Sequence, residues 1–205
     1  MVEDRALLGF PPCPTATELS TSRCPALALS KSRRATSLSG PSMALLYAIV
    51  NPANQRMLGG AGTDGAIHRA AGKELRAACY DVEEVERGIR CPTGEARITQ
   101  GFNLPASHVI HTVGPIYDVD PNPEASLRSA YRSSLRVAKQ NNIQYIAYTA
   151  ISCGNHRYPL DEAATIAIST VRELANDFKE VHFVHLTDEA YNVWLDKANE
   201  LLHDQ

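Results

Sequence analysis

Two asparagines and an aspartate flank a glycine-rich loop in the segment Ile49–Gly72, which reads IVNPANQRMLGGAGTDGAIHRAAG. An apolar run ends at Asn51 and Asn54, the loop Gly59–Gly62 follows, and Asp64 stands where a helical pattern begins. A helix start offers N–H groups without intrahelical partners, and it binds phosphate without a basic side chain. Glycines let the backbone approach such a ligand closely. The segment therefore predicts an anion site beside groups that can do chemistry.

The same segment has a plainer interpretation, in which the loop is a turn and Asp64 only caps the helix. The loop lacks the Lys-Ser or Lys-Thr pair of a Walker A motif, and it does not match GxGxxG. A phosphate would therefore be held by backbone donors. Asn51 and Asn54 offer hydrogen bonds to sugar hydroxyls, although asparagine is also common in plain turns. His68, one turn after Asp64, faces it or is an ordinary polar helix residue.

Composition excludes several classes of function. The chain has 205 residues and a formal net charge of −3, with a pI near 6.2. This length suits one domain with a substantial core, and the charge offers no basic surface for nucleic acid. No apolar run approaches the ~20 residues of a membrane span. The five cysteines form no CxxC pair and no zinc-type spacing with histidine, so we expect free thiols, a reducing compartment and no metal.

The chain divides into a leader and a folded domain. Residues 1–42 are rich in Pro, Ser and Thr without a sustained hydrophobic period, and we expect a disordered leader. Plastid import by this leader is an alternative to a cytoplasmic or nuclear location. In residues 43–205 the patterns predict strands at Leu45–Asn51, Ala96–Leu104, His108–Val113, Tyr145–Ser152 and Val181–Leu186, and helices at Ile67–Tyr80, Ser126–Asn141, Asp161–Phe178 (capped by Asp161) and Ala190–Leu202. This alternation predicts a layered α/β domain with largely parallel strands.

Two strand ends carry polar, loop-like sequence. One is the segment 51–64, and the other is Ser152–Pro159, which reads SCGNHRYP. Ligands of open α/β sheets bind outside the carboxyl ends of strands. If the two strands are parallel neighbours, their loops face each other across one cleft.

These blocks together resemble the macrodomain family, in wording closest to plant members of the MacroD type. The segment Ile49–Gly72 is similar to the family signature, Cys91–Pro115 to the next block, and Tyr148–Pro159 to the second ligand loop. The resemblance implies a three-layer α/β/α sandwich around a mixed, largely parallel sheet that binds ADP-ribose. We expect a monomer that needs no cofactor.

The resemblance also implies an enzyme, which hydrolyses mono-ADP-ribosyl esters on acidic side chains of proteins and O-acetyl-ADP-ribose. Asn54 falls on the contact to the distal ribose, and Asp64 falls on the group that orients the attacking water, so both are expected to be catalytic. The remaining ligand contacts are expected at Asn51, Ala53, Gly59, Gly60, Ala61, Gly62 and Thr63 in the first block, and at Ser152, Cys153, Gly154, Asn155 and His156 in the second.

The sequence departs from the family pattern at four places. Ser39–Leu45 lacks the acidic residue that contacts adenine in the family. This departure adds the alternative that the first strand of the sheet is absent. Pro52 and Ala61 replace the usual alanine and glycine. Asn155–Arg157 replaces an apolar residue, an aromatic residue and a glycine, and Arg157 offers a bidentate contact to phosphate.

These departures keep three alternatives to the hydrolase open. The chain could be a reader module that binds ADP-ribose without turnover, or a shortened product with impaired binding. A hydrolase with Cys153 as nucleophile and His156 as base is the third, and it requires a depressed thiol pKa.

Overall fold

Strand β2 (Tyr47–Pro52) is buried on both of its faces. Its side chains alternate between two hydrophobic clusters, with Ala48 and Val50 in one and Tyr47 and Ile49 in the other. Successive residues of a strand point to opposite faces of the sheet. A central strand of this kind needs helices on both sides, which is the arrangement found.

The computed structural model describes residues 27–31 and 47–203. Its strands are β1 (Leu27–Lys31), β2, β3 (Ala96–Gln100), β4 (His108–Thr112), β5 (Tyr145–Tyr148) and β6 (Glu180–His185), in the sheet order β1-β6-β5-β2-β4-β3. Every neighbouring pair is parallel except β3 and β4, which are antiparallel. The prediction of a mixed, largely parallel sheet is therefore confirmed.

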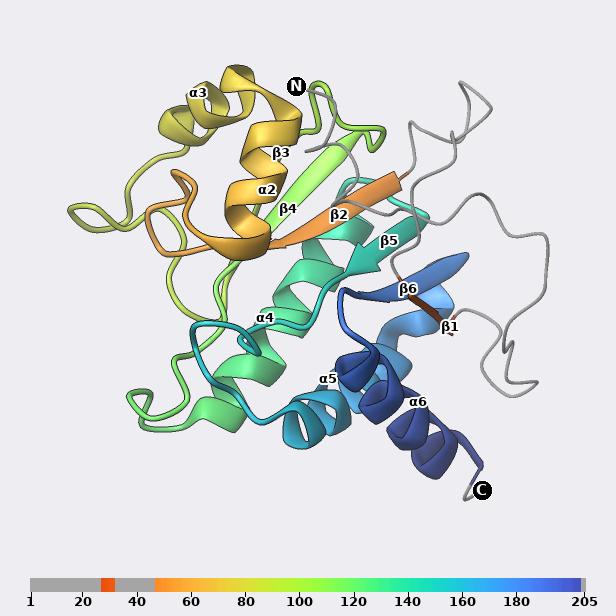
Figure 1. Ribbon diagram of the computed structural model, residues 1–205. Helices are drawn as coiled ribbons and strands as arrows, with labels where there is room; N and C mark the ends of the chain where they lie inside the picture. The colour runs from red at the N-terminus through yellow and green to blue at the C-terminus, as the bar shows by residue number, and fades with distance from the viewer. Residues whose placement is uncertain (1–26, 32–46, 204–205) are drawn as a thin grey trace.

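Helices cover the sheet on both faces (Figure 1). The first layer holds α2 (Gly62–Ala71) and α3 (Lys73–Asp81), and the second holds α4 (Pro123–Gln140), α5 (Leu160–Leu174), the 3-10 turn η2 (Ala175–Asp177) and α6 (Asp188–His203). Ile67 and Leu75 of the first layer pack in the cluster of Ile49, while Leu127 and Trp194 of the second pack with Val50. The predicted three-layer sandwich is confirmed.

Helix boundaries show where local chemistry overrides periodicity. The helix predicted over Ile67–Tyr80 is two helices, because Gly72 between them adopts φ +90°. Helix α4 starts earlier than predicted because the Asn122 side chain accepts a hydrogen bond from the Ala125 N–H. Helix α5 begins at Leu160 without a side-chain cap, so the capping role predicted for Asp161 is wrong.

A strand precedes β2, inside the segment predicted to be a disordered leader. Strand β1 pairs in parallel with β6, from Leu27 beside Val181 to Lys31 beside His185. The prediction of disorder over all of residues 1–42 is therefore wrong at 27–31. The edge of a sheet offers unpaired backbone N–H and C=O groups. A further strand can bond to them even when its side chains do not alternate between apolar and polar. The rest of 1–42, the boundary at 43 and the segment Ser39–Leu45 lie outside the described residues.

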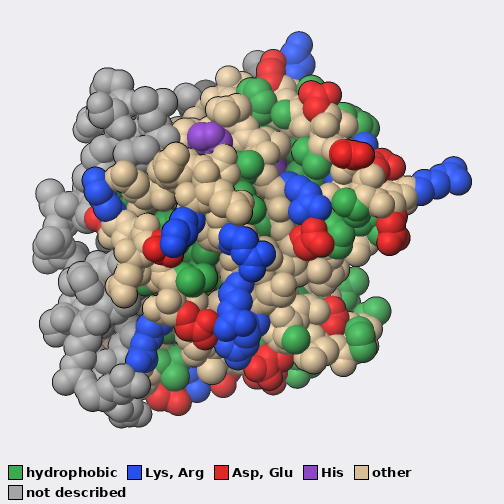
Figure 2. Space-filling model, turned by 180° about the vertical axis from the view of Figure 1, so that it is seen from behind, with side chains coloured by type: hydrophobic (Ala, Val, Ile, Leu, Met, Phe, Trp, Pro, Cys, Tyr) green, Lys and Arg blue, Asp and Glu red, His purple; other side chains and the backbone are tan. Residues whose placement is uncertain are grey.

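The outer face of α4 carries both signs of charge. Arg128 lies 3.0 Å from the Glu124 carboxylate, and Arg132 lies 2.6 Å from that of Glu173. On the face of the molecule seen in Figure 2, basic and acidic side chains lie side by side.

Within 27–31 and 47–203, no helix combines the length and the apolar character that crossing a membrane requires.

Gly65 holds the first loop against α2. A Cβ at this position would lie 2.3 Å from the backbone oxygen of Gly60. Gly65→Ala should therefore destabilise the fold by about 1–3 kcal/mol through overpacking, although alanine is the better helix former. Chemical denaturation checks this, with Gly154→Ala as the control because a Cβ there meets nothing within 4 Å. Equal stability of Gly65→Ala and the unmodified chain would contradict the close approach.

Candidate functional site

A cleft of about 620 Å³ lies at the carboxyl ends of the central strands. Its walls include Pro52 at the end of β2, Tyr148 at the end of β5 and Val184 in β6. Strands β2 and β5 are parallel neighbours. The loops that follow them, 59–64 and 152–156, both contribute to the lining, so the expected convergence of two loops on one cleft is confirmed.

Most of the predicted site residues line this cleft. They are Ala53, Asn54, Gly60, Ala61, Gly62, Thr63, Asp64, Ser152, Gly154, Asn155 and His156. Asn51, Gly59 and Cys153 are not part of the lining. Asn51 is fully buried in the sheet, and the backbone of Gly59 lies against the His68 ring. The ligand contacts predicted for these three residues are therefore not supported by their positions.

Asp64 lies in the first turn of α2 and is only 4% exposed. Its Oδ1 accepts a 2.7 Å hydrogen bond from Nδ2 of Asn51, and its Oδ2 lies 3.5 Å from Nδ2 of Asn54. The N-cap residue is Ala61, and no side chain caps the helix. The plainer interpretation of Asp64 as a cap is therefore wrong, because its carboxylate turns toward the sheet, where Asn51 donates to it.

Burial dominates the electrostatics of Asp64 and its neighbour His68. Nε2 of His68 lies 3.5 Å from Oδ1 of Asp64, a distance that brings the two groups together without a hydrogen bond of good geometry. Burial raises the pKa of Asp64, while the hydrogen bond from Asn51 and the charge of His68 oppose the rise. Burial lowers the pKa of His68, against the pull of Asp64. Both shifts therefore work against the charged forms, the carboxylate of Asp64 and the imidazolium of His68.

The first loop lies directly over the Asp64 carboxylate. A Cβ on Gly60 would lie 3.0 Å from Asp64 Oδ2 and 3.3 Å from Asn54 Nδ2. Gly62 adopts φ +59° and starts α2, whose first N–H groups have no intrahelical acceptor. Ala61 adopts φ −90° and ψ 173°, an extended conformation that alanine takes without strain. The replacement of a loop glycine by Ala61 is therefore tolerated.

The second loop presents a hydroxyl that has no partner among the described residues. Ser152 adopts φ +64°, and its buried Oγ lacks a hydrogen-bond partner there. The loop is closed by the Tyr158 N–H, which donates to the Ser152 carbonyl at 3.0 Å. Gly114, after β4, also lines the cleft, and a Cβ on it would lie 2.2 Å from Ser152 Oγ. The backbone of Gly114 therefore packs against the buried Ser152 hydroxyl.

His156 and Cys153 each bond the backbone. His156 Nδ1 lies 3.1 Å from the carbonyl oxygens of both Gly114 and Pro115, so this nitrogen donates. The Cys153 thiol lies 3.4 Å from the carbonyl oxygen of Ile151, and burial raises its pKa to about 12. A nucleophilic thiol needs a depressed pKa. The raised pKa of the Cys153 thiol therefore does not support the alternative of a Cys153–His156 hydrolase.

Several lining residues escaped the sequence analysis. They are Ile49, Pro52, Ala66, Ile67, Arg69, Gly114, Ala147, Tyr148, Thr149, Ala150, Val184 and Leu186. Many of these are apolar, and a sequence does not distinguish apolar residues that line a cleft from apolar core. Gly114 carried a usable signal, because it follows a predicted strand end at the same edge of the sheet.

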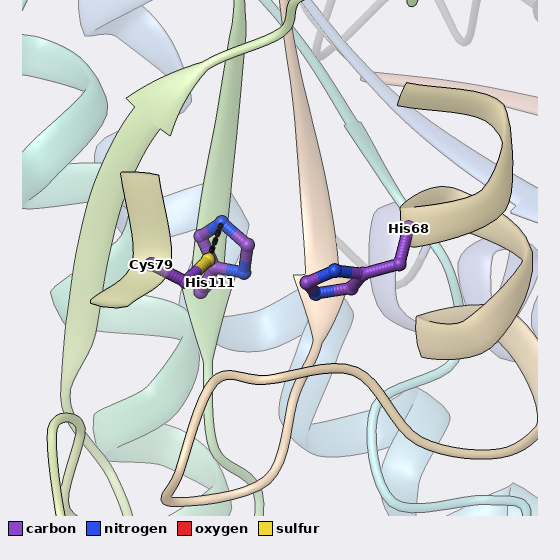
Figure 3. A group of neighbouring side chains, drawn as sticks. All are labelled: His68, Cys79 and His111. Carbon is purple, nitrogen blue, oxygen red and sulfur yellow. Dashed lines mark hydrogen bonds between the residues drawn. The ribbon is translucent and has the colours of Figure 1, made fainter. Parts of the chain in front are cut away.

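Three side chains with metal-ligating atoms meet between α2, α3 and β4. The ligand atoms of His68, Cys79 and His111 lie within 4.8 Å of one another, and Figure 3 shows the His68 and His111 rings approaching from opposite sides. Burial raises the pKa of the Cys79 thiol to about 12 and lowers that of His111 to about 3. Both ring nitrogens of His111 have hydrogen-bond partners inside the protein. Hydrogen bonds therefore account for the positions of His111 and Cys79, whereas Nε2 of His68 has no hydrogen-bond partner among the described residues.

The sequence profile of the Macro domain matches residues 50–167. The chain belongs to the Macro domain family. A macro domain-containing protein of Vibrio parahaemolyticus is 50% identical over 147 residues, which are 72% of this chain and 86% of that protein. The ADP-ribose glycohydrolase MACROD2 of Xenopus laevis is 42% identical over 159 residues, which are 75% of this chain and 37% of that protein.

A solved macro domain has the same fold. The Oceanobacillus iheyensis macrodomain with ADP superposes with a TM-score of 0.72 at 40% identity, covering 77% of this chain and 85% of that chain. The resemblance drawn from the sequence blocks is thereby confirmed at the level of family and fold.

Arg157 takes no part in the macro-domain cleft. Its backbone adopts φ +55°, and its largely exposed side chain lies 3.0 Å from the Asp118 carboxylate. The predicted phosphate contact is therefore not supported. Arg157→Gly should relieve the left-handed strain and leave stability within about 1 kcal/mol, because an exposed ion pair contributes little. In calorimetry with ADP-ribose, the affinity of Arg157→Gly should lie within about twofold of that of the unmodified chain. A tenfold loss of affinity, about 1.4 kcal/mol, would restore the phosphate contact.

The raised pKa of Asp64 predicts a pH-dependent cost to stability. The folded state binds the proton more tightly than the unfolded chain, so stability falls as pH rises from the unfolded pKa of about 3.9 through the folded one. Asp64→Asn removes the ionised carboxyl and should raise Tm near neutral pH by about 2–4 °C, or about 1 kcal/mol. The gain should vanish below about pH 3.9. Melting curves against pH check this, and a gain that persists in acid would contradict it.

Proposed function

We propose that this macro domain binds ADP-ribose in the cleft, with the diphosphate between the two loops. The ADP bound to the Oceanobacillus iheyensis macrodomain, 40% identical, supports this ligand. The N–H groups at the start of α2 and the unpartnered Ser152 hydroxyl are donors of the kind that a diphosphate needs. The cleft volume of about 620 Å³ also lies within the usual range for small-molecule sites, about 300–1,000 Å³.

The second part of the proposal is hydrolysis of an ester at the distal ribose. The substrates are mono-ADP-ribosyl esters on acidic side chains of proteins, and O-acetyl-ADP-ribose. Asp64 orients a water and accepts its proton while the water oxygen attacks the ester carbon. The bond from that carbon to the ribose oxygen breaks, and the ribose oxygen takes from Asp64 the proton that the water gave up. The glycohydrolase name of the Xenopus laevis relative supports an enzyme.

The observation that carries this proposal is the buried carboxylate in the wall of the cleft. Asp64 is 4% exposed and lines the cleft between Asn54 and the first loop. Burial raises its pKa, and a base is most effective when its pKa approaches the working pH. Because Gly60 has no side chain, the loop backbone lies close to Oδ2 of Asp64, where a Cβ would come within 3.0 Å.

The proposed reaction needs no cofactor, because its groups come from the chain, the substrate and water. Cys79, Cys91 and Cys153 are free thiols. They support a reducing compartment, so we propose the cytoplasm or nucleus as the working location.

Asp64→Ala tests the enzyme proposal. The variant should bind ADP-ribose and lose ~10²–10⁴ in turnover, which is the usual contribution of a positioned base. Calorimetry measures the binding, and release of ADP-ribose from a protein mono-ADP-ribosylated on Asp or Glu measures the rate. Asp161→Ala, an aspartate in the first turn of α5, is the matched control and should behave as the unmodified chain. Undiminished turnover by Asp64→Ala would remove Asp64 from the mechanism.

Water labelled with ¹⁸O tests which bond breaks. Attack on the ester carbon puts the label in the released carboxylate, whereas attack on the ribose carbon puts it in ADP-ribose. We expect the label in the carboxylate, and mass spectrometry of both products distinguishes the two routes.

A reader module remains the second candidate, and the replaced second loop favours it. Asn155, His156 and Arg157 stand where the family has an apolar residue, an aromatic residue and a glycine. Micromolar binding of ADP-ribose, about −8 kcal/mol, without turnover of either ester would favour the reader. The same binding would exclude a shortened product with impaired binding.

A further inference from the structure

A hydrogen-bonded chain runs from β3 through β4 and β2 to the Asp64 carboxylate. Thr99 Oγ1 lies 3.0 Å from His111 Nε2, and His111 Nδ1 lies 3.1 Å from Asn51 Nδ2. The same Asn51 nitrogen lies 2.7 Å from Asp64 Oδ1. Asn51 and His111 are register partners across β2 and β4, so the sheet itself sets their separation.

The chemistry of the partners fixes the direction of each bond. A carboxylate only accepts, so the Asn51 amide nitrogen must face Asp64, and its second hydrogen is donated to His111 Nδ1. His111 Nδ1 is therefore unprotonated, and the ring carries its proton on Nε2. That proton is donated toward Thr99 Oγ1, with the Cys79 sulfur 3.7 Å from the same nitrogen.

The interior keeps His111 in this uncharged form. Its side chain is completely buried, and burial lowers its pKa to about 3. The ionisable groups that face it and Asp64 include His68 on α2 and Cys79 on α3. The His68 ring centroid lies 6.0 Å from that of His111. A neutral ring with a fixed proton is a reliable acceptor for the Asn51 amide.

We propose that His111 is a positioning residue, which holds the Asn51 amide so that the amide fixes the Asp64 carboxylate at the edge of the cleft. This role rests on the proposed function of Asp64. Without an acceptor at His111 Nδ1, the Asn51 amide is free to turn. Asp64 then loses its shortest hydrogen bond and its orientation toward the bound ester.

A metal ion at His68, Cys79 and His111 is the competing explanation of the cluster in Figure 3. An ion on His111 Nε2 would displace the bond to Thr99 and move the ring proton to Nδ1. Two donors would then face each other across the 3.1 Å between His111 and Asn51. The hydrogen-bond chain explains the same positions without that conflict.

Two substitutions separate positioning from packing. In His111→Asn, Oδ1 falls near the former Nδ1 and keeps an acceptor for Asn51. In His111→Gln, the polar atoms fall near the former Nε2, and the acceptor for Asn51 is lost. We expect kcat to fall by ~10–10²-fold in His111→Gln, as for a small misplacement of a reacting group, with KM nearly unchanged. His111→Asn should restore kcat to within about threefold.

Milder variants keep the test informative if a change at His111 prevents folding. Thr99→Val removes the acceptor of the Nε2 proton, whereas Thr99→Ser keeps it, so only the first should lower kcat. His108→Gln, at the other end of β4, is the matched control. The His108 side chain contacts Gln100 and Ser107 and takes no part in the hydrogen bonds that link Thr99 to Asp64. Equal kcat in His111→Gln and His111→Asn, or in Thr99→Val and Thr99→Ser, together with an unchanged pKa of Asp64, would overturn the positioning role.

A readout independent of turnover is the pKa of Asp64, measured by ¹³C NMR together with the titration of His68. The hydrogen bond from Asn51 lowers the pKa of Asp64, so this pKa should rise in His111→Gln and stay unchanged in His111→Asn. If the pKa rises while kcat is unaffected, Asp64 is not the base and the proposed function fails. If Asp64→Ala abolishes turnover but His111→Gln changes neither pKa nor kcat, only the positioning role fails. Turnover that a chelator abolishes and zinc restores would favour the metal and overturn the proposal.

Discussion

The burial of the Asp64 carboxylate, where β2 meets α2, is the constraint on which the rest of the site depends. A buried charge is costly unless donors reach it, and the 2.7 Å bond from Asn51 is the shortest that Asp64 receives from the described side chains. Asn51 lies near the carboxyl end of β2. The strand must therefore end close to the start of α2 for this hydrogen bond to form. The loop between them folds back over the carboxylate, and Gly60 and Gly65 permit this because their backbones touch where side chains would clash.

The parallel sheet turns this local constraint into a cleft. Strands β2 and β5 run side by side in the same direction, so the loop after each emerges at one edge. The diphosphate of the proposed ligand would lie near the Asp64 carboxylate, and the repulsion between the two anions would have to be offset. The start of α2 supplies partial positive charge, while Asn51 and Asn54 orient N–H groups at the carboxylate itself. The proposed ligand and the proposed base would thereby share one wall of the cleft.

Periodicity predicted the elements of this fold well and the details of the site less well. Strand β2 was foreseen because apolar residues run up to Asn51, and Asp64 was singled out because it follows a glycine loop. The break at Gly72 depends on its φ of +90°, which glycine permits but does not require. Strand β1 pairs with β6 through backbone hydrogen bonds. Such pairing does not require an alternation of apolar and polar side chains, so the sequence pattern does not reveal it. The inward turn of Asn51 was missed because the sequence does not reveal that His111 lies beside it in register.

The two asparagines after β2 show how one motif divides into two tasks. Asn51 still belongs to the pleat, so its side chain points into the layer beneath α2 and bonds only protein atoms. Asn54 lies beyond the strand, donates to the Gly59 carbonyl at 3.1 Å and also lines the cleft. Under the proposed function, substitutions of the inner residue act on the base through its hydrogen bonds, whereas those of the outer residue act on the bound sugar directly. For this reason the inner chain through His111 should govern rate, and the residues of the rim should govern affinity.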